Sequence, residues 1–70
     1  MSIKSAIAGI EYTIHKIDTG DSALNAFLLT LGCYSGEKVK LIRKLKSGCI
    51  ISLKGVKYHV DNHLANAILV

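Results

Sequence analysis

The sequence predicts a mainly β domain, in which about five short strands curl into a small barrel with one inserted α-helix and a short helical turn before the last strand. Apolar and polar residues alternate with the period of a half-buried strand in several short stretches, and one other stretch follows helical spacing. Glycines separate these stretches, and Pro is absent. Because 70 residues leave room for little more than one core, we expect a single domain over residues 1–70.

The first strand is expected over residues 10–17, because every second residue is apolar and these residues lie on one face of a strand: Ile10, Tyr12 and Ile14. Turn formers at 18–22 include candidate N-caps, so a helix is predicted to begin near Ser22. Its core stripe falls at i, i+3, i+4 and i+7, on Leu24, Phe27, Leu28 and Leu31. The first strand and this helix are therefore expected to share the core.

A corner follows the helix. Gly32, directly after Leu31, is expected to end the helix in the left-handed conformation, and Gly36 is expected to form a second tight turn. Cys33 and Tyr34 lie between the two glycines. The corner thus joins the helix to the longest strand pattern in the chain.

That pattern covers residues 38–46. Its even positions are mostly lysine and are expected outside (Lys38, Lys40, Ile42, Lys44, Lys46), and its odd positions are expected inside (Val39, Leu41, Arg43, Leu45). Ser47-Gly48 is predicted as a loop, and residues 49–54 as a strand with Ile51 and Leu53 inward. Lys54-Gly55 is predicted as a two-residue hairpin turn leading to a strand over 56–60. A helical turn capped by Asp61 and a closing strand over 67–70 complete an SH3-like barrel, whose closure hides the strand edges.

The formal net charge of +4 is concentrated in one region. Between Lys38 and Lys57 there are seven basic residues and no acid. Such a face suits acidic protein surfaces or phosphates, but it lacks the interleaved aromatic residues on which single-stranded bases stack. The N-terminus has no continuous apolar run typical of a secretory signal, and the uncharged stretch 22–36 is shorter than the ~20 residues that span a bilayer. We therefore expect a cytoplasmic chain without membrane insertion.

The corner and the C-terminal half together resemble the FeoA family. The resemblance lies in the helix ending at Leu31-Gly32, the turn before Gly36-Glu37-Lys38-Val39, the hairpin Gly55, and Leu64-Ala65 ahead of an apolar terminal strand, and it covers roughly residues 9–70. Members commonly read Leu-Gly-hydrophobic-x-Pro-Gly across the corner, where this chain has Cys33 and Ser35 in place of the hydrophobic residue and the proline. The motifs are structural, so they point to a fold family more directly than to an activity.

The resemblance implies a non-catalytic accessory protein of ferrous iron uptake, which binds the cytoplasmic GTPase region of the membrane iron transporter FeoB and modulates transport. The residues agree with a protein that is not an enzyme, because the chain has no Gly-Lys-Ser or Gly-Lys-Thr phosphate loop and no catalytic triad signature. A small-barrel nucleic-acid binder and a transition-metal sensor or carrier are the alternatives. No nucleic acid is expected as the partner, and the sequence does not predict an oligomeric state.

Four residues are the candidates for partner binding: Tyr34, Lys38, Lys40 and Lys57. An aromatic residue in a glycine-bounded turn suits an interface, although Tyr34 could instead fold over the barrel end. Leu31, Gly32, Gly36 and Gly55 are assigned structural roles at turns. No cofactor is expected; weak binding of Fe²⁺ or Zn²⁺ would have only His59 and His63 as candidate ligands, too few for a complete site. Cys33 and Cys49 form no C-x-x-C motif and are expected to be small buried hydrophobes.

Overall fold

The computed structural model describes residues 1–70 and has two antiparallel sheets. The four-stranded sheet has the order β1-β3-β4-β5, with β1 at Glu11–Thr13, β3 at Lys38–Leu45, β4 at Gly48–Leu53 and β5 at Val56–Asp61. The second sheet pairs β2 (Lys16–Ile17) with β6 (Ile68–Leu69). The helices are the 3₁₀-helix η1 (Ile3–Ser5), α1 (Ser22–Thr30) and α2 (Asn62–Ala67). The predicted mainly β fold with a helix inserted before the longest strand is confirmed.

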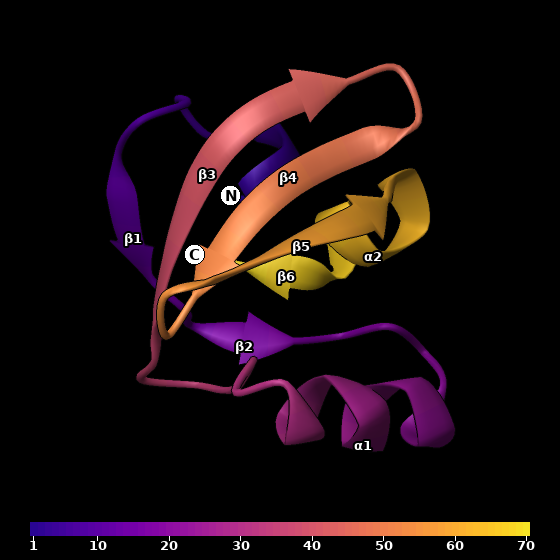
Figure 1. Cartoon of the computed structure of the whole chain (residues 1–70). Coiled ribbons are helices and arrows are strands. Elements are labelled where there is room, and N and C mark those ends of the chain that lie inside the picture. Colours follow the sequence, from indigo (N-terminus) through magenta and orange to yellow (C-terminus); the bar gives the residue numbers. More distant parts are fainter.

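The core lies on one side of the four-stranded sheet. In Figure 1, the N-terminal turn lies behind β3 and β4, α2 lies at the end of β5, β6 lies between β5 and β2, and α1 lies beyond β2. Inward side chains of the sheet meet residues from α1 and from both ends of the chain. These core residues are at most 1% exposed: Val39, Leu41, Ile51, Leu53, Ile3, Ala6, Leu28, Ala65 and Ile68. The inward positions predicted for Ile51 and Leu53 are confirmed, and so is the burial of Cys33 and Cys49.

The two chain ends lie together and are hydrogen-bonded. The backbone N–H of Val70 donates to the carbonyl of Met1 at 2.8 Å, and Ser2 forms an isolated bridge with Leu69. This pairing carries η1 onto the core, where Ile3 is fully buried. The sequence did not predict this role for the N-terminal residues, because a single turn of 3₁₀-helix has no periodic pattern.

The prediction of one continuous strand over residues 10–17 is wrong, because the structure has two short strands there. Strand β1 pairs with β3 in the four-stranded sheet, and β2 pairs with β6 in the other sheet. Between them, Ile14 bonds to the corner turn through its carbonyl and N–H, and the N–H of His15 donates to Leu69 at 2.7 Å. The chain therefore changes sheets at these two residues, and Ile10, at the outer end, is 45% exposed instead of buried.

Helix α1 begins and ends as predicted. Asp21 is the N-cap, and its Oδ1 accepts from the N–H groups of Ala23 at 2.9 Å and Leu24 at 3.3 Å. At the other end Gly32 has φ +89°, and the N–H groups of Gly32 and Cys33 donate to the Leu29 and Leu28 carbonyls, the two bonds of a Schellman motif.

The core stripe of α1 is narrower than predicted. Leu28 is buried and Leu24 and Leu31 are half-buried, but Phe27 is 54% exposed, which corrects its assignment to the core. A helix turns about 100° per residue, so Leu24, Leu28 and Leu31 lie close to one line along α1 while Phe27 lies to one side of it. Because α1 packs at the margin of the barrel, only that line is covered (Figure 1).

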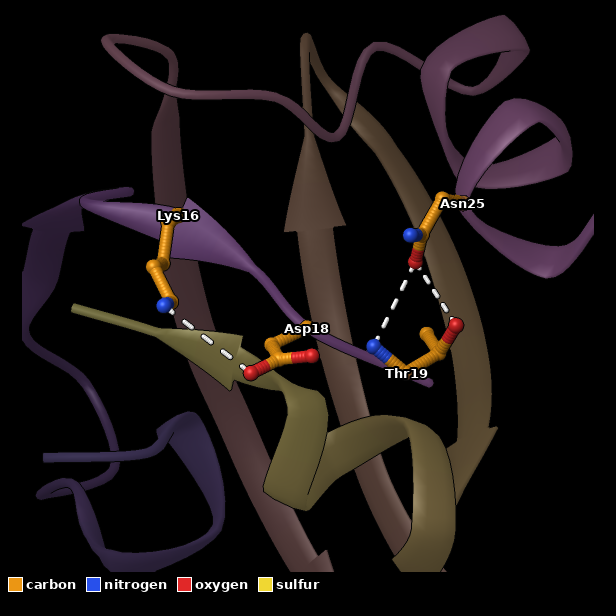
Figure 2. Close-up of polar contacts among 4 residues, drawn as sticks. All are labelled: Lys16, Asp18, Thr19 and Asn25. Carbon is orange, nitrogen blue, oxygen red and sulfur yellow. Dashed lines mark hydrogen bonds and ion pairs between the residues drawn. The ribbon is translucent and has the colours of Figure 1, made fainter. Parts of the chain in front are cut away.

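The segment that leads into α1 is fastened to the helix by Asn25. Figure 2 shows the Asn25 amide oxygen within hydrogen-bond distance of both the Thr19 N–H, at 3.3 Å, and the Thr19 hydroxyl, at 2.6 Å. Thr19 is a polar residue with only 8% exposure. Lys16 and Asp18 form an exposed ion pair at 3.9 Å nearby, of the kind that contributes little to stability. The Thr19–Asn25 contacts therefore give the buried Thr19 hydrogen-bond partners within an otherwise exposed loop.

A β-bulge in β3 overturns the predicted faces of its second half. Leu41 pairs with Ile51, but Arg43, not Ile42, pairs with Ile50, so one residue is extra. Directly opposed residues share a face, so Arg43 joins the outer face and Lys44, opposite buried Cys49, moves to the core side at the end of the strand. The prediction of an inward Arg43 is therefore wrong, whereas Lys44 leaves the outer face of the sheet but is exposed, as predicted.

The remaining turns are close to their predicted places. Lys54 and Gly55 have φ +50° and +81°, both positive as a type I′ hairpin turn requires, so this turn is confirmed. Gly48 belongs to β4 and not to a loop. Asp61 caps α2 through a 2.8 Å bond from the Leu64 N–H, as predicted, but α2 is a six-residue helix that includes Ala67. The closing strand is accordingly shortened to Ile68–Leu69.

Candidate functional site

The corner between α1 and β3 is a tight turn docked on the β1–β2 segment. The Glu37 N–H donates to the Tyr34 carbonyl at 3.1 Å, and Gly36 at the third position has φ +92°, the arrangement of a type II turn. Ile14 accepts from the Gly36 N–H at 2.9 Å and donates to the Glu37 carbonyl at 2.8 Å. These bonds fix the turn, and with it the backbone that presents Tyr34.

The side chain of Tyr34 is held by the β4–β5 hairpin and not by the core. The Lys54 ammonium donates to the Tyr34 hydroxyl at 3.2 Å, and that hydroxyl donates to Glu37 Oε1 at 3.4 Å. The same ammonium lies 5.4 Å from the centroid of the ring and 3.9 Å from Glu37 Oε1. Tyr34 is half-buried but lies outside the group of aromatics packed on the core, which are Tyr12 and Tyr58. The ring is thus ordered while part of it stays open to solvent.

Lys54 connects the two turns of the corner. Its methylene groups pass over Gly32, where a Cβ atom would lie 3.3 Å from the Lys54 Cε. The hydrogen bond to Tyr34 raises the pKa of Lys54, and the charge of Glu37 raises it further. Lys54 is therefore a fixed cation at the corner. Sequence reasoning missed this contact because Lys54 and Tyr34 are 20 residues apart and nothing local indicates which turns meet.

The three predicted lysines lie on the outer face of the sheet, next to this corner. Lys38 donates to the Thr13 hydroxyl at 2.7 Å. Lys40 and Lys57 occupy one row across the strands, on either side of Ser52. Both are exposed, and neither has a carboxylate within ion-pair distance. The structure thus divides the four candidates into one aromatic at the corner and three lysines on the adjoining face.

The histidines do not form a metal site. His59 is in β5, where its Nε2 lies 3.1 Å from the Ser47 hydroxyl, and His63 is exposed in α2. His15 is exposed at the junction of β1 and β2. Nowhere do three His, Cys, Asp or Glu side chains come together, so the residues present do not fit a transition-metal ion, which takes three or four ligands.

Burial governs the chemistry of the two cysteines. It raises the pKa of the Cys33 thiol from 9.0 to about 11. Burial also raises the pKa of Cys49, and the positive charges of Lys44 and Lys4 lower it by less. A thiol that keeps its proton is a poor nucleophile and a poor metal ligand, so both cysteines act as core side chains.

Several solved structures share this fold. The crystal structure of Stenotrophomonas maltophilia FeoA complexed with zinc, described as a prokaryotic SH3 domain protein, matches with a TM-score of 0.86 at 15% identity, covering 100% of this chain and 88% of that one. A crystal structure of an iron uptake regulatory protein (FeoA) matches at 0.85 and 20% identity, covering 97% and 91%. The solution structure of iron(II) transport protein A from Clostridium thermocellum matches at 0.85 and 14% identity, but this chain, 97% covered, spans only 43% of that protein. These likenesses confirm the SH3-like fold.

No helix of the chain is long and apolar enough to span a bilayer. A comparison with curated proteins found no match. The family model for the FeoA domain, however, matches residues 1–70, including the N-terminal residues that lay outside the resemblance recognised from sequence. The chain therefore belongs to the FeoA family, which is associated with ferrous iron transport.

Proposed function

We propose that this chain is a non-catalytic, cytoplasmic accessory protein of ferrous iron uptake that binds the GTPase-containing transporter FeoB and modulates its activity. The observation that carries the proposal is the FeoA domain match over residues 1–70. The corner geometry supports it, because an aromatic residue already ordered by neighbouring side chains loses little conformational freedom on binding. The function is thus one of protein contact, and the candidate contact surface is Tyr34 with Lys38, Lys40 and Lys57.

The lysines of this surface favour an acidic protein partner. Lys57 and Lys40 make no ion pair, although Glu11 of β1 lies opposite Lys40, so their charges can be reached by carboxylates of another protein. Charged groups at the rim of an interface accelerate association, while a central aromatic residue contributes most of the affinity. We therefore expect an acidic patch on the cytoplasmic region of FeoB opposite this face.

The test is a binding titration of the purified chain against the cytoplasmic region of FeoB from the same organism, with GDP, with a non-hydrolysable GTP analogue, and without nucleotide. Tyr34→Ala is expected to weaken binding by roughly 30-fold, the effect of an aromatic hot spot of about 2 kcal/mol. Lys40→Ala with Lys57→Ala is expected to slow association and reduce its salt dependence. Lys16→Ala, an exposed lysine in the other sheet, is the control and should bind as the unaltered chain does. Absence of binding in every nucleotide state would refute the proposal.

A further inference from the structure

A second group of cations lies at the opposite end of the four-stranded sheet, where β3 turns into β4. We call it the hairpin tip and define it as Arg43, Lys44 and Lys46 together with Lys4 of η1. All four are exposed, and none has a carboxylate within ion-pair distance. The acid at this end is Asp61, opposite Gly48, and its carboxylate is engaged by the Leu64 N–H. With Asp61 included, the hairpin tip carries +3 of the chain's formal +4.

The β-bulge in β3 distributes these cations around the hairpin tip. Arg43 is on the outer face of the sheet, Lys44 is on the core side opposite Cys49, and Lys46 is in the turn itself. Lys4 lies near the same cysteine as Lys44, since the charges of both lysines lower the pKa of Cys49. Positive charge therefore surrounds the end of the hairpin instead of lining one face.

The hairpin tip is also held in place. The Asn62 side-chain amide donates to the Lys46 carbonyl at 2.9 Å, and the Ser47 hydroxyl lies 3.1 Å from His59 Nε2. Behind the turn, the backbone of Gly48 packs so closely on β5 that no Cβ would fit there. These contacts keep the backbone of the three hairpin cations, Arg43, Lys44 and Lys46, fixed relative to the barrel, so their charges act together.

We propose that the hairpin tip docks end-on against the anionic phospholipid headgroups of a membrane surface. Lysine and arginine side chains that reach a plane of negative charge each contribute to binding without requiring a shaped site. The hairpin tip has no aromatic residue, which disfavours a single-stranded nucleic acid or a protein hot spot. The choice of a lipid surface also rests on the proposed function, which brings the chain beside a membrane transporter.

The position of the hairpin tip leaves the corner free. Tyr34 precedes the first residue of β3, whereas Arg43, Lys44 and Lys46 are at its last residues and the turn that follows. Eight residues of strand extend for roughly 24 Å, and Figure 1 shows the two turns at opposite ends of the sheet. A chain resting on lipid through the hairpin tip would therefore present Tyr34 away from the membrane surface, where a cytoplasmic domain of the transporter can reach it.

The test is sedimentation of the full chain with phosphatidylglycerol vesicles and with phosphatidylcholine vesicles, at low and high salt. The altered chain is R43Q/K44Q/K46Q. The matched control is K38Q/K40Q/K57Q, which loses the same charge from the outer face and the corner end of the sheet. All six residues are exposed, and a thermal melt of each variant establishes that it is folded. If a triple variant does not fold, K46Q and K57Q replace the two triples.

We expect binding to phosphatidylglycerol but not to phosphatidylcholine, and release at high salt. Each cation contributes about fivefold in affinity, so R43Q/K44Q/K46Q should lose roughly a hundredfold and K38Q/K40Q/K57Q fivefold or less. Equal losses in the two triples would mean that net charge alone drives binding, and would overturn the proposal. Tighter binding to a short DNA duplex than to the vesicles, lost in R43Q/K44Q/K46Q, would assign the hairpin tip to nucleic acid instead. Because the vesicles contain no transporter, neither outcome bears on the titration with FeoB.

Discussion

Replacing Gly48 by Ala tests the closest backbone approach in the structure. Gly48 is the first residue of β4, is opposite Asp61 of β5, and has φ +151°. A Cβ atom there would collide with the carbonyl oxygen of Val60 and lie 2.8 Å from both the Val60 carbonyl carbon and the Asp61 Cα. All three neighbours are backbone atoms, so no side chain can rotate away. The strands would have to separate at this pair.

The magnitude follows from what that separation disturbs. A non-glycine residue at such a φ costs about 1–3 kcal/mol. Displacing Asp61 also weakens the N-cap of α2, which contributes about 1 kcal/mol. We therefore expect Gly48→Ala to lower the free energy of unfolding by about 2–4 kcal/mol, a large share of the roughly 4–10 kcal/mol available to a domain of this size. The melting temperature should fall by at least about 10 °C.

The assay is urea denaturation and a thermal melt, followed by circular dichroism. Gly55→Ala is the matched control, because Gly55 has φ +81° with nothing within 4 Å of the added Cβ. It reports the cost of the backbone conformation alone, about 1–2 kcal/mol. If the two variants lose the same stability, the steric argument for Gly48 is wrong.

Three further predictions concern the corner. Ser35→Pro should raise the free energy of unfolding by about 0.4–1 kcal/mol, because proline suits the second position of a type II turn and the Ser35 N–H makes no hydrogen bond; Ser35→Ala should be neutral, and a loss in urea melts for the proline variant would contradict the turn assignment. Tyr34→Ala should change the free energy of unfolding by less than about 1 kcal/mol, since its partner Lys54 is exposed; a larger loss would place the ring in the core. The Cys33 thiol stays protonated up to a pKa of about 11, whereas the unfolded chain releases that proton near 9.0, so stability is full below pH 9 and falls toward pH 11 by about 2–3 kcal/mol. Cys33→Ala should remove this part of the alkaline decline, and an unchanged decline would show that other groups cause it.

The elements with strong local signals could be read from the sequence. The cap at Asp21, the Schellman glycine Gly32 and the hairpin turn at Lys54-Gly55 each depend on a few adjacent residues, and the structure has them at or within a residue of the expected places. The alternation of β4 likewise predicted inward Ile51 and Leu53. Local backbone chemistry decides such features before any long-range contact is made.

Features set by distant segments could not be read in this way. The extra residue at Ile42 leaves the alternation of the sequence intact while reversing which faces Arg43 and Lys44 occupy, and only the partner strand reveals it. The burial of Ile3 depends on the pairing of the two chain ends. For the candidate site, the turn that presents Tyr34 could be predicted because it is local, whereas the contact of Tyr34 with Lys54 joins two turns that the sequence leaves unrelated.

The pairing of Met1 with Val70 makes the backbone close to a ring. A short flexible linker could join the two ends, and new ends could then be opened at Gly55, where the turn is exposed and the surrounding space is open. We expect such a circular permutant to fold, as a cooperative melt would show. The pairing of β2 with β6 likewise joins segments far apart in the sequence, so a tag added at either end would be attached beside this pair of strands.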